Sequence, residues 1–249
     1  MQNTKFYTFS VIVAAHNEEK YITDCIQALK LQDYPGEFEI IVVDNASNDK
    51  TSEIAKELGV QVMYESKKGV SHALISGSKI ATGEIFAYTD ADTRPPKDWL
   101  SKLNEAFNRS ETVVGAGGPP YFYDGPKWAD WLMHKVFVKI YLKYFHPKYK
   151  GLPGYNMSIR ADVYHKSGGF EPGYNWGQDW KMAERAGKFG EVIFDTNIFV
   201  YTSFRRFHGN HKNPIKRTAR VIKEVTIGLV RMAPMIYLNK NLKMQKPIR

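Results

Sequence analysis

The first 110 residues alternate between short apolar segments and segments with helical periodicity, and this alternation constrains the fold more than any other feature. Each apolar segment has the length and composition of a buried strand, and each is followed by a stretch whose apolar residues recur at helical spacing. Strands that alternate with helices form a parallel sheet with right-handed crossovers. The sequence therefore predicts an α/β protein with a Rossmann-like, mainly parallel sheet flanked by helices. The four predicted strands are residues 9–14, 38–43, 60–64 and 85–88.

Composition agrees with an ordinary globular chain in a reducing compartment. The 249 residues are 43% hydrophobic and 24% charged, which suits one substantial α/β domain. The single cysteine, Cys25, excludes an intramolecular disulfide, and we expect it in the core on the first helix. The N-terminal segment has no signal-peptide pattern, and no apolar stretch approaches the roughly 20 residues that span a bilayer. We expect a cytoplasmic chain, either soluble or peripheral on the inner face of the cell membrane.

Charge is divided very unevenly along the chain. Residues 1–125 hold 12 basic and 18 acidic side chains, a net of −6, so residues 126–249 hold 23 basic and 8 acidic ones, a net of +15. From residue 201 onward there are 12 basic residues and one acid, Glu224. This asymmetry predicts a polyanionic partner, either nucleic acid or an anionic membrane surface.

Polar residues gather directly after the predicted strands. In open α/β sheets, ligands bind at the carboxyl ends of the strands, near a switch in strand order. Any one of these loops could instead be a helix cap or a turn, as we expect for Asn17 before the first helix and Asp49 before the second. Four of them on one edge favour a crevice for a nucleoside diphosphate. The residues are His16, Asn17, Glu18, Asp44, Asn45, Lys67, Lys68, Gly69, Asp90 and Asp92.

Asp90 and Asp92 are the most informative of these residues. Side chains two apart in an extended segment share a face, so both carboxylates can converge on one ligand. Mg²⁺ and Mn²⁺ prefer such oxygens and usually complete their shell with substrate phosphates. Turn and cap chemistry before Pro95-Pro96 is the simpler alternative.

Several segments together resemble the family 2 inverting glycosyltransferases of the GT-A fold. These segments are residues 11–19 (VIVAAHNEE), 41–49 (IVVDNASND), 89–92 (TDAD), 154–160 (GYNMSIR) and 168–170 (GGF). The resemblance implies that the strand ends bind a nucleotide-sugar, with Asp44 at the nucleobase, Asp90 near the ribose and Asp92 ligating Mn²⁺ or Mg²⁺. The expected nucleotide-sugar contacts are Ala14, Ala15, His16, Asn17, Glu18, Asp44, Lys68, Gly69, Asp90 and Ala91.

Sugar transfer with inversion also needs a base for the acceptor hydroxyl. The resemblance points to Asp179 in Gly177-Gln178-Asp179-Trp180, with Gln178 where the family usually has a second acid. The alternative is a helix N-terminal Asp favoured by the macrodipole. The expected acceptor contacts are Asn156, Trp176, Gln178 and Trp180, and His208 is a secondary metal candidate.

Two basic amphipathic segments, residues 128–145 and 214–236, lie in the second half. Such helices suit an anionic membrane interface, but they also suit packing on the sheet or in a dimer. For 128–145 the two interpretations stay open, and for 214–236 we favour the membrane. A lipid-linked acceptor would explain both the transferase motifs and these helices.

The sequence thus predicts a GT-A catalytic domain over residues 1–205, with a nucleotide-binding half (1–110) and an acceptor-side half (111–205), and a basic helical extension over 206–249. The expected activity is metal-dependent, inverting transfer of a single sugar from a nucleoside-diphosphate sugar to a glycan or lipid-linked acceptor. We expect no nucleic-acid partner, and the sequence does not define an oligomeric state.

Four alternative functions fit parts of this pattern less well. A HAD-type phosphatase would use Asp90-Ala91-Asp92-Thr93, but on its first strand. A nucleotidyltransferase needs a Gly-rich basic loop after strand one, and a processive synthase needs a Gln-x-x-Arg-Trp element and membrane spans. A non-enzymatic module that binds membrane or nucleic acid would leave the four polar loops without a purpose.

Overall fold

The structure is a computed structural model that describes residues 4–146, 151–173 and 177–208, except the side chains of Tyr144, Phe145 and His208. Three sequence predictions lie outside these residues: the helix at 214–236, the remainder of the extension over 206–249, and the acceptor contact of Trp176.

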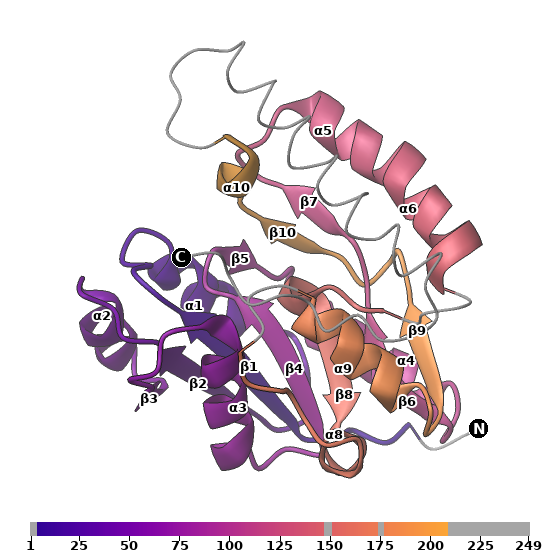
Figure 1. Ribbon diagram of the computed structural model, residues 1–249, viewed down its shortest axis with the longest axis horizontal. Coiled ribbons are helices and arrows are strands. Elements are labelled where there is room, and N and C mark those ends of the chain that lie inside the picture. Colours follow the sequence, from indigo (N-terminus) through magenta and orange to yellow (C-terminus); the bar gives the residue numbers. More distant parts are fainter. Residues whose placement is uncertain (1–3, 147–150, 174–176, 209–249) are drawn as a thin grey trace.

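A seven-stranded sheet forms the centre of the molecule, in the order β3-β2-β1-β4-β8-β6-β9 (Figure 1). Strand β8 runs antiparallel to both of its neighbours, and all the other neighbouring pairs are parallel. The prediction of a mainly parallel sheet is therefore confirmed, and each of the four predicted strands is present. The strands are β1 (Phe9–Ala15), β2 (Phe38–Asp44), β3 (Gln61–Tyr64), β4 (Ile85–Asp90), β6 (Val113–Gly117), β8 (Met157–Arg160) and β9 (Glu191–Phe194).

Helices cover both faces of this sheet. Residues of α1, α2 and α4 share one buried cluster with alternate residues of β1, and residues of α3, α8 and α9 share another with the opposite face. The first helix shows the reason: Ile22, Cys25, Ile26 and Leu29 recur at helical spacing and are fully buried, as predicted. The helices are α1 (Ile22–Lys30), α2 (Thr51–Glu57), α3 (Val70–Ile80), α4 (Trp99–Asn108), α8 (Ala161–Lys166) and α9 (Gln178–Ala186).

One predicted helix cap is wrong and another is supported. Helix α1 begins at Ile22, and Asn17 stands outside it with φ 57°, where its side chain accepts a hydrogen bond from the N–H of Asn48 at 2.8 Å. Asp49 does serve the start of α2, because its carboxylate accepts from the N–H of Thr51 at 3.0 Å. Asn17 therefore connects the loops that follow β1 and β2 instead of capping a helix.

A small second sheet, in the order β5-β10-β7, lies beside the carboxyl end of β4. Its strands are β5 (Thr93–Arg94), β10 (Val200–Thr202) and β7 (Pro120–Phe122), and β10 leads into the short helix α10 (Arg205–His208). Because Thr202 is registered with Thr93, the chain after β10 arrives next to Asp92. Pairing that is distant in sequence thus brings a basic segment to the strand-end edge.

A continuous helical segment from Lys127 to Phe145 borders this second sheet (Figure 1). It comprises α5 (Lys127–Leu132), η1 (Met133–Phe137), α6 (Val138–Ile140) and η2 (Tyr141–Phe145), of which η1 and η2 are π-helical. A further 3-10 turn, η3 (Gly154–Asn156), precedes β8. Within the described part of the chain, no helix has both the length and the apolarity to cross a membrane.

Helix α3 packs closely on the sheet at Gly77, and this generates a stability prediction. A Cβ at this position would lie 2.6 Å from Cγ2 of Ile12 and 2.9 Å from Cγ2 of Val43. Overpacking a core by one methyl group typically costs about 1–3 kcal/mol, whereas alanine gains about 1 kcal/mol of helix propensity over glycine. We expect Gly77→Ala to lower the free energy of unfolding by up to about 2 kcal/mol in urea titration. Lys79→Ala on the exposed side of α3 is the control; a stabilised Gly77→Ala protein would contradict the close approach.

Candidate functional site

A crevice of about 490 Å³ opens at the carboxyl ends of β1 and β4. This is the edge at which the sequence placed a ligand, and β1 lies between β2 and β4, where the strand order switches. Among the residues predicted to bind the nucleotide-sugar or metal, Ala14, Ala15, His16, Glu18, Asp90, Ala91 and Asp92 line this crevice. The remaining lining residues are Asn45, Val70, Ala73, Arg205 and Arg206.

Four residues that were predicted to contact the nucleotide-sugar are not among the lining residues. Asp44 is buried and accepts a hydrogen bond from the N–H of Ser47 at 3.1 Å, whereas Lys68 is exposed. Gly69 adopts φ 129° before α3 and donates its N–H to the side chain of Asn45 at 2.7 Å. Asn17 bridges to Asn48 as described above. These residues shape the strand-end loops, and their contact with a ligand stays a prediction.

Asn45 is a lining residue that was predicted as one of the strand-end polar residues but not as a nucleotide-sugar contact. Its amide group donates to the carbonyls of Glu65 and Lys67 at 3.2 and 2.7 Å and accepts from Gly69, so it holds the loop before α3 in place. Its own carbonyl lies 2.7 Å from Nδ1 of His16. The only signal in the sequence was its position immediately after Asp44, at the end of a buried strand.

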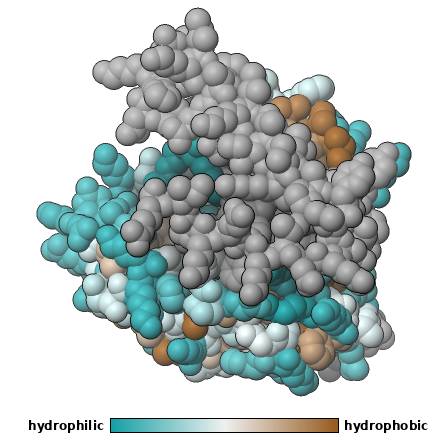
Figure 2. All heavy atoms as spheres, in the orientation of Figure 1, coloured by the Kyte–Doolittle hydropathy of each residue, from teal (hydrophilic) through white to brown (hydrophobic). Residues whose placement is uncertain are grey.

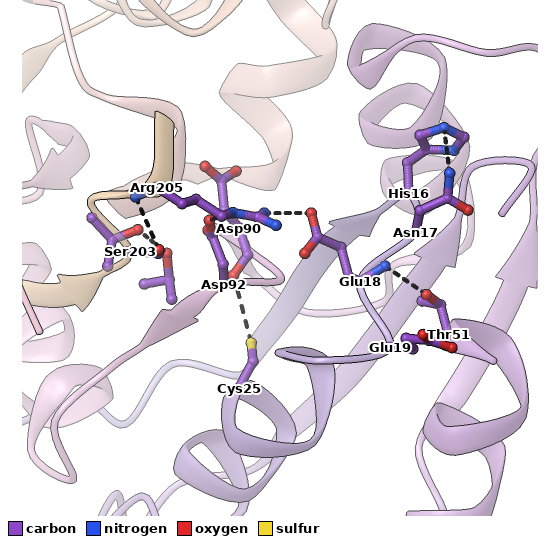
Figure 3. Close-up of polar contacts among 12 residues, drawn as sticks. His16, Asn17, Glu18, Glu19, Cys25, Thr51, Asp90, Asp92, Ser203 and Arg205 are labelled. Carbon is purple, nitrogen blue, oxygen red and sulfur yellow. Dashed lines mark hydrogen bonds and ion pairs between the residues drawn. The ribbon is translucent and has the colours of Figure 1, made fainter. Parts of the chain in front are cut away.

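Arg205 connects two acids across the crevice (Figure 3). Its Nε donates to Oδ2 of Asp92 at 2.6 Å, and Nη2 donates to Oε1 of Glu18 at 2.5 Å. The guanidinium also lies over the ring of Tyr21, 4.4 Å from its centroid. In the sequence, Arg205 is only one of the 12 basic residues from residue 201 onward, because no local pattern shows that β10 pairs with β5.

Burial and crowding of like charges dominate the electrostatics of the crevice. Burial raises the pKa of Asp90 to about 7, and the neighbouring charge of Asp92 adds to the effect. Burial also raises the pKa of Glu18, against the opposing hydrogen bond from Arg205. The second oxygen of Glu18, Oε2, is buried without a hydrogen-bond partner. Such an orphaned acceptor favours a ligand with a cation or a donor group.

The donor set fits a divalent cation that is shared with a phosphate ligand. Asp92 is only 12% exposed and supplies a carboxylate to the crevice, and the orphaned Oε2 of Glu18 belongs to the same network. Among the described residues, no three His, Cys, Asp or Glu side chains form a metal-binding group. A cation here would therefore rely on ligand oxygens for most of its shell, as Mg²⁺ commonly does. The side chain of His208, the secondary metal candidate, lies outside the described residues.

Asp179 occupies the first turn of α9 and is held by backbone donors. Its Oδ2 accepts from the N–H of Gly154 in η3 at 2.7 Å. Burial raises the pKa of Asp179, against the opposing hydrogen bonds from the N–H groups of Gly154 and Trp180. The carbonyl of Tyr155, the next residue in η3, accepts from Oγ1 of Thr89 at 3.0 Å, which ties η3 to the end of β4. Asp179 therefore lies near enough to Asp90 for its charge to raise the pKa of Asp90.

Two of the predicted acceptor contacts have structural partners. Asn156 is fully buried, accepts from Nε1 of Trp99 at 2.9 Å and donates to the carbonyl of Ile198 at 2.7 Å. Gln178 is buried and accepts a hydrogen bond from the hydroxyl of Ser71. These contacts account for both side chains as parts of the framework, so the structure does not bring Asn156 to an exposed acceptor surface.

Trp180, the residue after Asp179, borders an apolar groove of about 200 Å³. The groove lies between the Lys127 to Phe145 helical segment and η3, and Tyr155 and Phe194 contribute to its wall. Hydrophobic side chains also gather on the surface over α5 and α6 (Figure 2). The complete lining is Pro119, Pro120, Met133, Phe137, Val138, Ile140, Tyr141, Pro153, Tyr155, Trp180 and Phe194.

The structure is an α/β fold with a polar crevice at the carboxyl edge of its sheet, which is where α/β enzymes commonly bind their ligands. The sequence model of the family described as "Glycosyl transferase family 2" matches residues 10–168. The chain therefore belongs to glycosyl transferase family 2, the family that the resemblance implied. This membership favours a glycosyltransferase over the phosphatase and the non-enzymatic alternatives.

Relatives and solved structures agree with this membership. The chain is 34% identical over 121 residues to the dolichyl N-acetyl-alpha-D-glucosaminyl phosphate 3-beta-D-2,3-diacetamido-2,3-dideoxy-beta-D-glucuronosyltransferase of Methanococcus voltae, covering 44% of this chain and 38% of the relative. It is 33% identical over 135 residues to the dolichol-phosphate mannosyltransferase of Pyrococcus furiosus, covering 52% and 37%. This chain thus spans well under half the length of either relative.

The GT-A fold is confirmed by comparison with a solved mannosyltransferase, PcManGT from Pyrobaculum calidifontis in complex with GDP-Man and Mn²⁺. The TM-score is 0.66 at 20% identity, over 94% of this chain and 69% of the other. At that identity the similarity concerns the fold alone.

The raised pKa of Asp90 generates a prediction about stability and pH. The folded protein retains a proton on Asp90 that the unfolded chain has already released, so stability falls as the pH rises from about 4 to about 7. An asparagine side chain at this position would stay neutral over the whole range. We expect Asp90→Asn to raise the free energy of unfolding by about 1–3 kcal/mol at pH 8 and by much less at pH 5. Denaturant titrations at both pH values test this, with Asp24→Asn in the exposed pair with Arg94 as control. An equal effect at both pH values would refute it.

Proposed function

We propose that this protein is a metal-dependent inverting glycosyltransferase that moves a single sugar from a nucleoside-diphosphate sugar to an acceptor hydroxyl. The observation that carries the proposal is that two carboxylates occupy separate positions near the carboxyl edge of the sheet. Asp92 lies in the crevice at the end of β4, and Asp179 lies beyond it at the start of α9, next to an apolar groove. Donor and acceptor would then approach from opposite sides.

The strand-end crevice is the proposed donor site. Its polar rim of His16, Glu18 and Asn45 would hold the nucleoside, with Asp44 behind it and Asp90 near the ribose. Asp92 would hold Mn²⁺ or Mg²⁺, which when bound neutralises charge on the leaving diphosphate. Arg206 also lines the crevice and adds positive charge on the same side. The solved mannosyltransferase in complex with GDP-Man and Mn²⁺, which shares the fold, supports this donor class.

Asp179 is the proposed general base. Its carboxylate would accept the proton of the acceptor hydroxyl as the hydroxyl oxygen bonds to the anomeric carbon, and the nucleoside diphosphate would leave from the opposite face. A raised pKa makes Asp179 a stronger proton acceptor than an ordinary carboxylate. The N–H groups of Gly154 and Trp180 fix its orientation.

The acceptor we propose is lipid-linked. The groove beside Trp180 is lined almost entirely by apolar side chains, which suit a hydrocarbon chain better than a free sugar. The names of two relatives contain dolichyl or dolichol phosphate, a lipid carrier. The lipid would lie in the groove while its hydroxyl-bearing end reaches Asp179.

A lipid acceptor would place the enzyme on a membrane surface. Trp128 and Trp131 are 47% and 61% exposed on α5, and Lys135 and Lys139 are exposed farther along the same helical segment. Exposed tryptophans beside lysines are typical of helices that lie in an anionic interface. We therefore propose a peripheral position on the cytoplasmic face. The domain limits of 1–205 and 206–249 stay predictions.

Replacing Asp179 tests the assignment of the base. Asp179→Asn keeps the size of the side chain and removes proton acceptance, so we expect kcat to fall by about 10²–10⁴-fold. Titration calorimetry with the nucleotide-sugar should show donor affinity within about threefold of wild type, since the contact is not made in the ground state. Asp162→Asn, in the first turn of α8, is the matched control. Transfer at the wild-type rate by Asp179→Asn would rule out this base.

Shortening one groove side chain tests the acceptor class. Phe137→Ala should raise KM about tenfold or more for a long-chain polyprenyl acceptor in detergent, because a buried Phe contributes about 1.5–3 kcal/mol. KM for a short, water-soluble analogue should not change. Phe189→Ala, at a 50% exposed position outside the groove, is the control. An equal change for both acceptors would argue against lipid binding in the groove.

A further inference from the structure

We propose that Arg205 competes with the divalent cation for Asp92, so that the cation is held firmly only when the donor's diphosphate arrives with it. The inference rests on the proposed role of Asp92 as the metal ligand. It starts from the triad in which one guanidinium joins Asp92 to Glu18 across the crevice (Figure 3). The side chain that closes this triad comes from α10, far from both acids in sequence.

The contact uses the carboxylate that the cation would need. Nε of Arg205 lies 2.6 Å from Oδ2 of Asp92, and the Asp92 side chain is only 12% exposed. A divalent cation on the same carboxylate would face the guanidinium at short range, with little water between them to screen the repulsion. The two positive groups therefore weaken each other's hold on Asp92.

The backbone that carries Arg205 is fixed independently of the triad. Oγ1 of Thr93 donates to Oγ1 of Thr202 at 2.9 Å, and the hydroxyl of Ser203 donates to Asp124 at 2.6 Å. Phe204 is buried, with its ring 4.9 Å from that of Phe122. The backbone of Arg205 is thus held next to Asp92 by these contacts. Its guanidinium can leave Asp92 by rotation of the side chain alone.

This arrangement links cation binding to donor binding. A diphosphate brings several anionic oxygens, which complete the shell of the cation and offset its repulsion with Arg205. Without the diphosphate, the cation must displace an arginine held by two charge-assisted hydrogen bonds. The free cation should therefore bind weakly, and the cation and the donor should bind cooperatively.

Binding of Mn²⁺ to the donor-free protein tests the inference without measuring transfer. Electron paramagnetic resonance of unbound Mn²⁺ gives the affinity directly. Arg205→Gln should bind Mn²⁺ about tenfold more tightly than wild type, within the usual range of coupling between sites. Arg206→Gln is the matched control, since it removes the same charge from the same crevice. If both variants tighten binding equally, or Arg205→Gln does not tighten it, direct competition is overturned.

Arg205→Lys gives an independent test at constant charge. Charge repulsion alone predicts unchanged Mn²⁺ binding, because lysine keeps the positive charge in the crevice. Competition for Asp92 predicts tighter binding than wild type, because one ammonium group cannot reproduce the two charge-assisted hydrogen bonds that the guanidinium makes to Asp92 and Glu18. This variant also serves if Arg205→Gln fails to fold, and binding no tighter than wild type contradicts the proposal.

Asp92→Asn separates this inference from the proposed function. It should abolish Mn²⁺ binding in both the wild-type and the Arg205→Gln backgrounds. Unchanged binding by Asp92→Asn would remove the proposed metal ligand and the inference with it. Binding that depends on Asp92 but not on Arg205 would remove the inference alone.

Discussion

The parallel register of β1 with its two neighbours is the constraint on which the rest of the site depends. Ala15 pairs with Asp44 of β2, and Ala14 pairs with Asp90 of β4, so three strands end at the same level. Backbone hydrogen bonds fix this register, and a slip of one residue would turn every buried side chain to the opposite face. The acids at the strand ends are therefore brought together by the pairing that also forms the core.

The fold of the first 110 residues could be predicted because its elements are local and periodic. The apolar residues of α1 recur at helical spacing from Ile22 to Leu29, and those of α4 do so from Trp99 to Phe107. The second half could not be predicted in this way. Strand β8 inserts antiparallel between β4 and β6, and β10 pairs with β5 more than 100 residues earlier. Such contacts leave no trace in local periodicity, because each short strand is specified by distant partners.

Site residues that follow a predicted strand could be predicted from the sequence, whereas those brought to the site by long-range strand pairing could not. Asp90, Asp92 and Glu18 follow strands directly, and their polarity contrasts with the apolar segments before them. Arg205 belongs to a basic tail in which nothing distinguishes one cation from another until β10 is placed. Asn156 shows the opposite case: a motif residue predicted as an acceptor contact is buried and hydrogen-bonded to Trp99 and Ile198.

The hydrogen bonds of η3 fix the distance between the carboxyl end of β4 and Asp179. One residue of this turn is bonded to Thr89 at the end of β4, and the preceding one is bonded to Asp179. The turn therefore sets the distance between the strand-end edge, where we propose that the donor binds, and Asp179, the proposed proton acceptor. An acceptor hydroxyl that extends too far or not far enough from its bound chain would not lie in a reactive position. The enzyme could therefore select acceptors by the length between the bound chain and the hydroxyl.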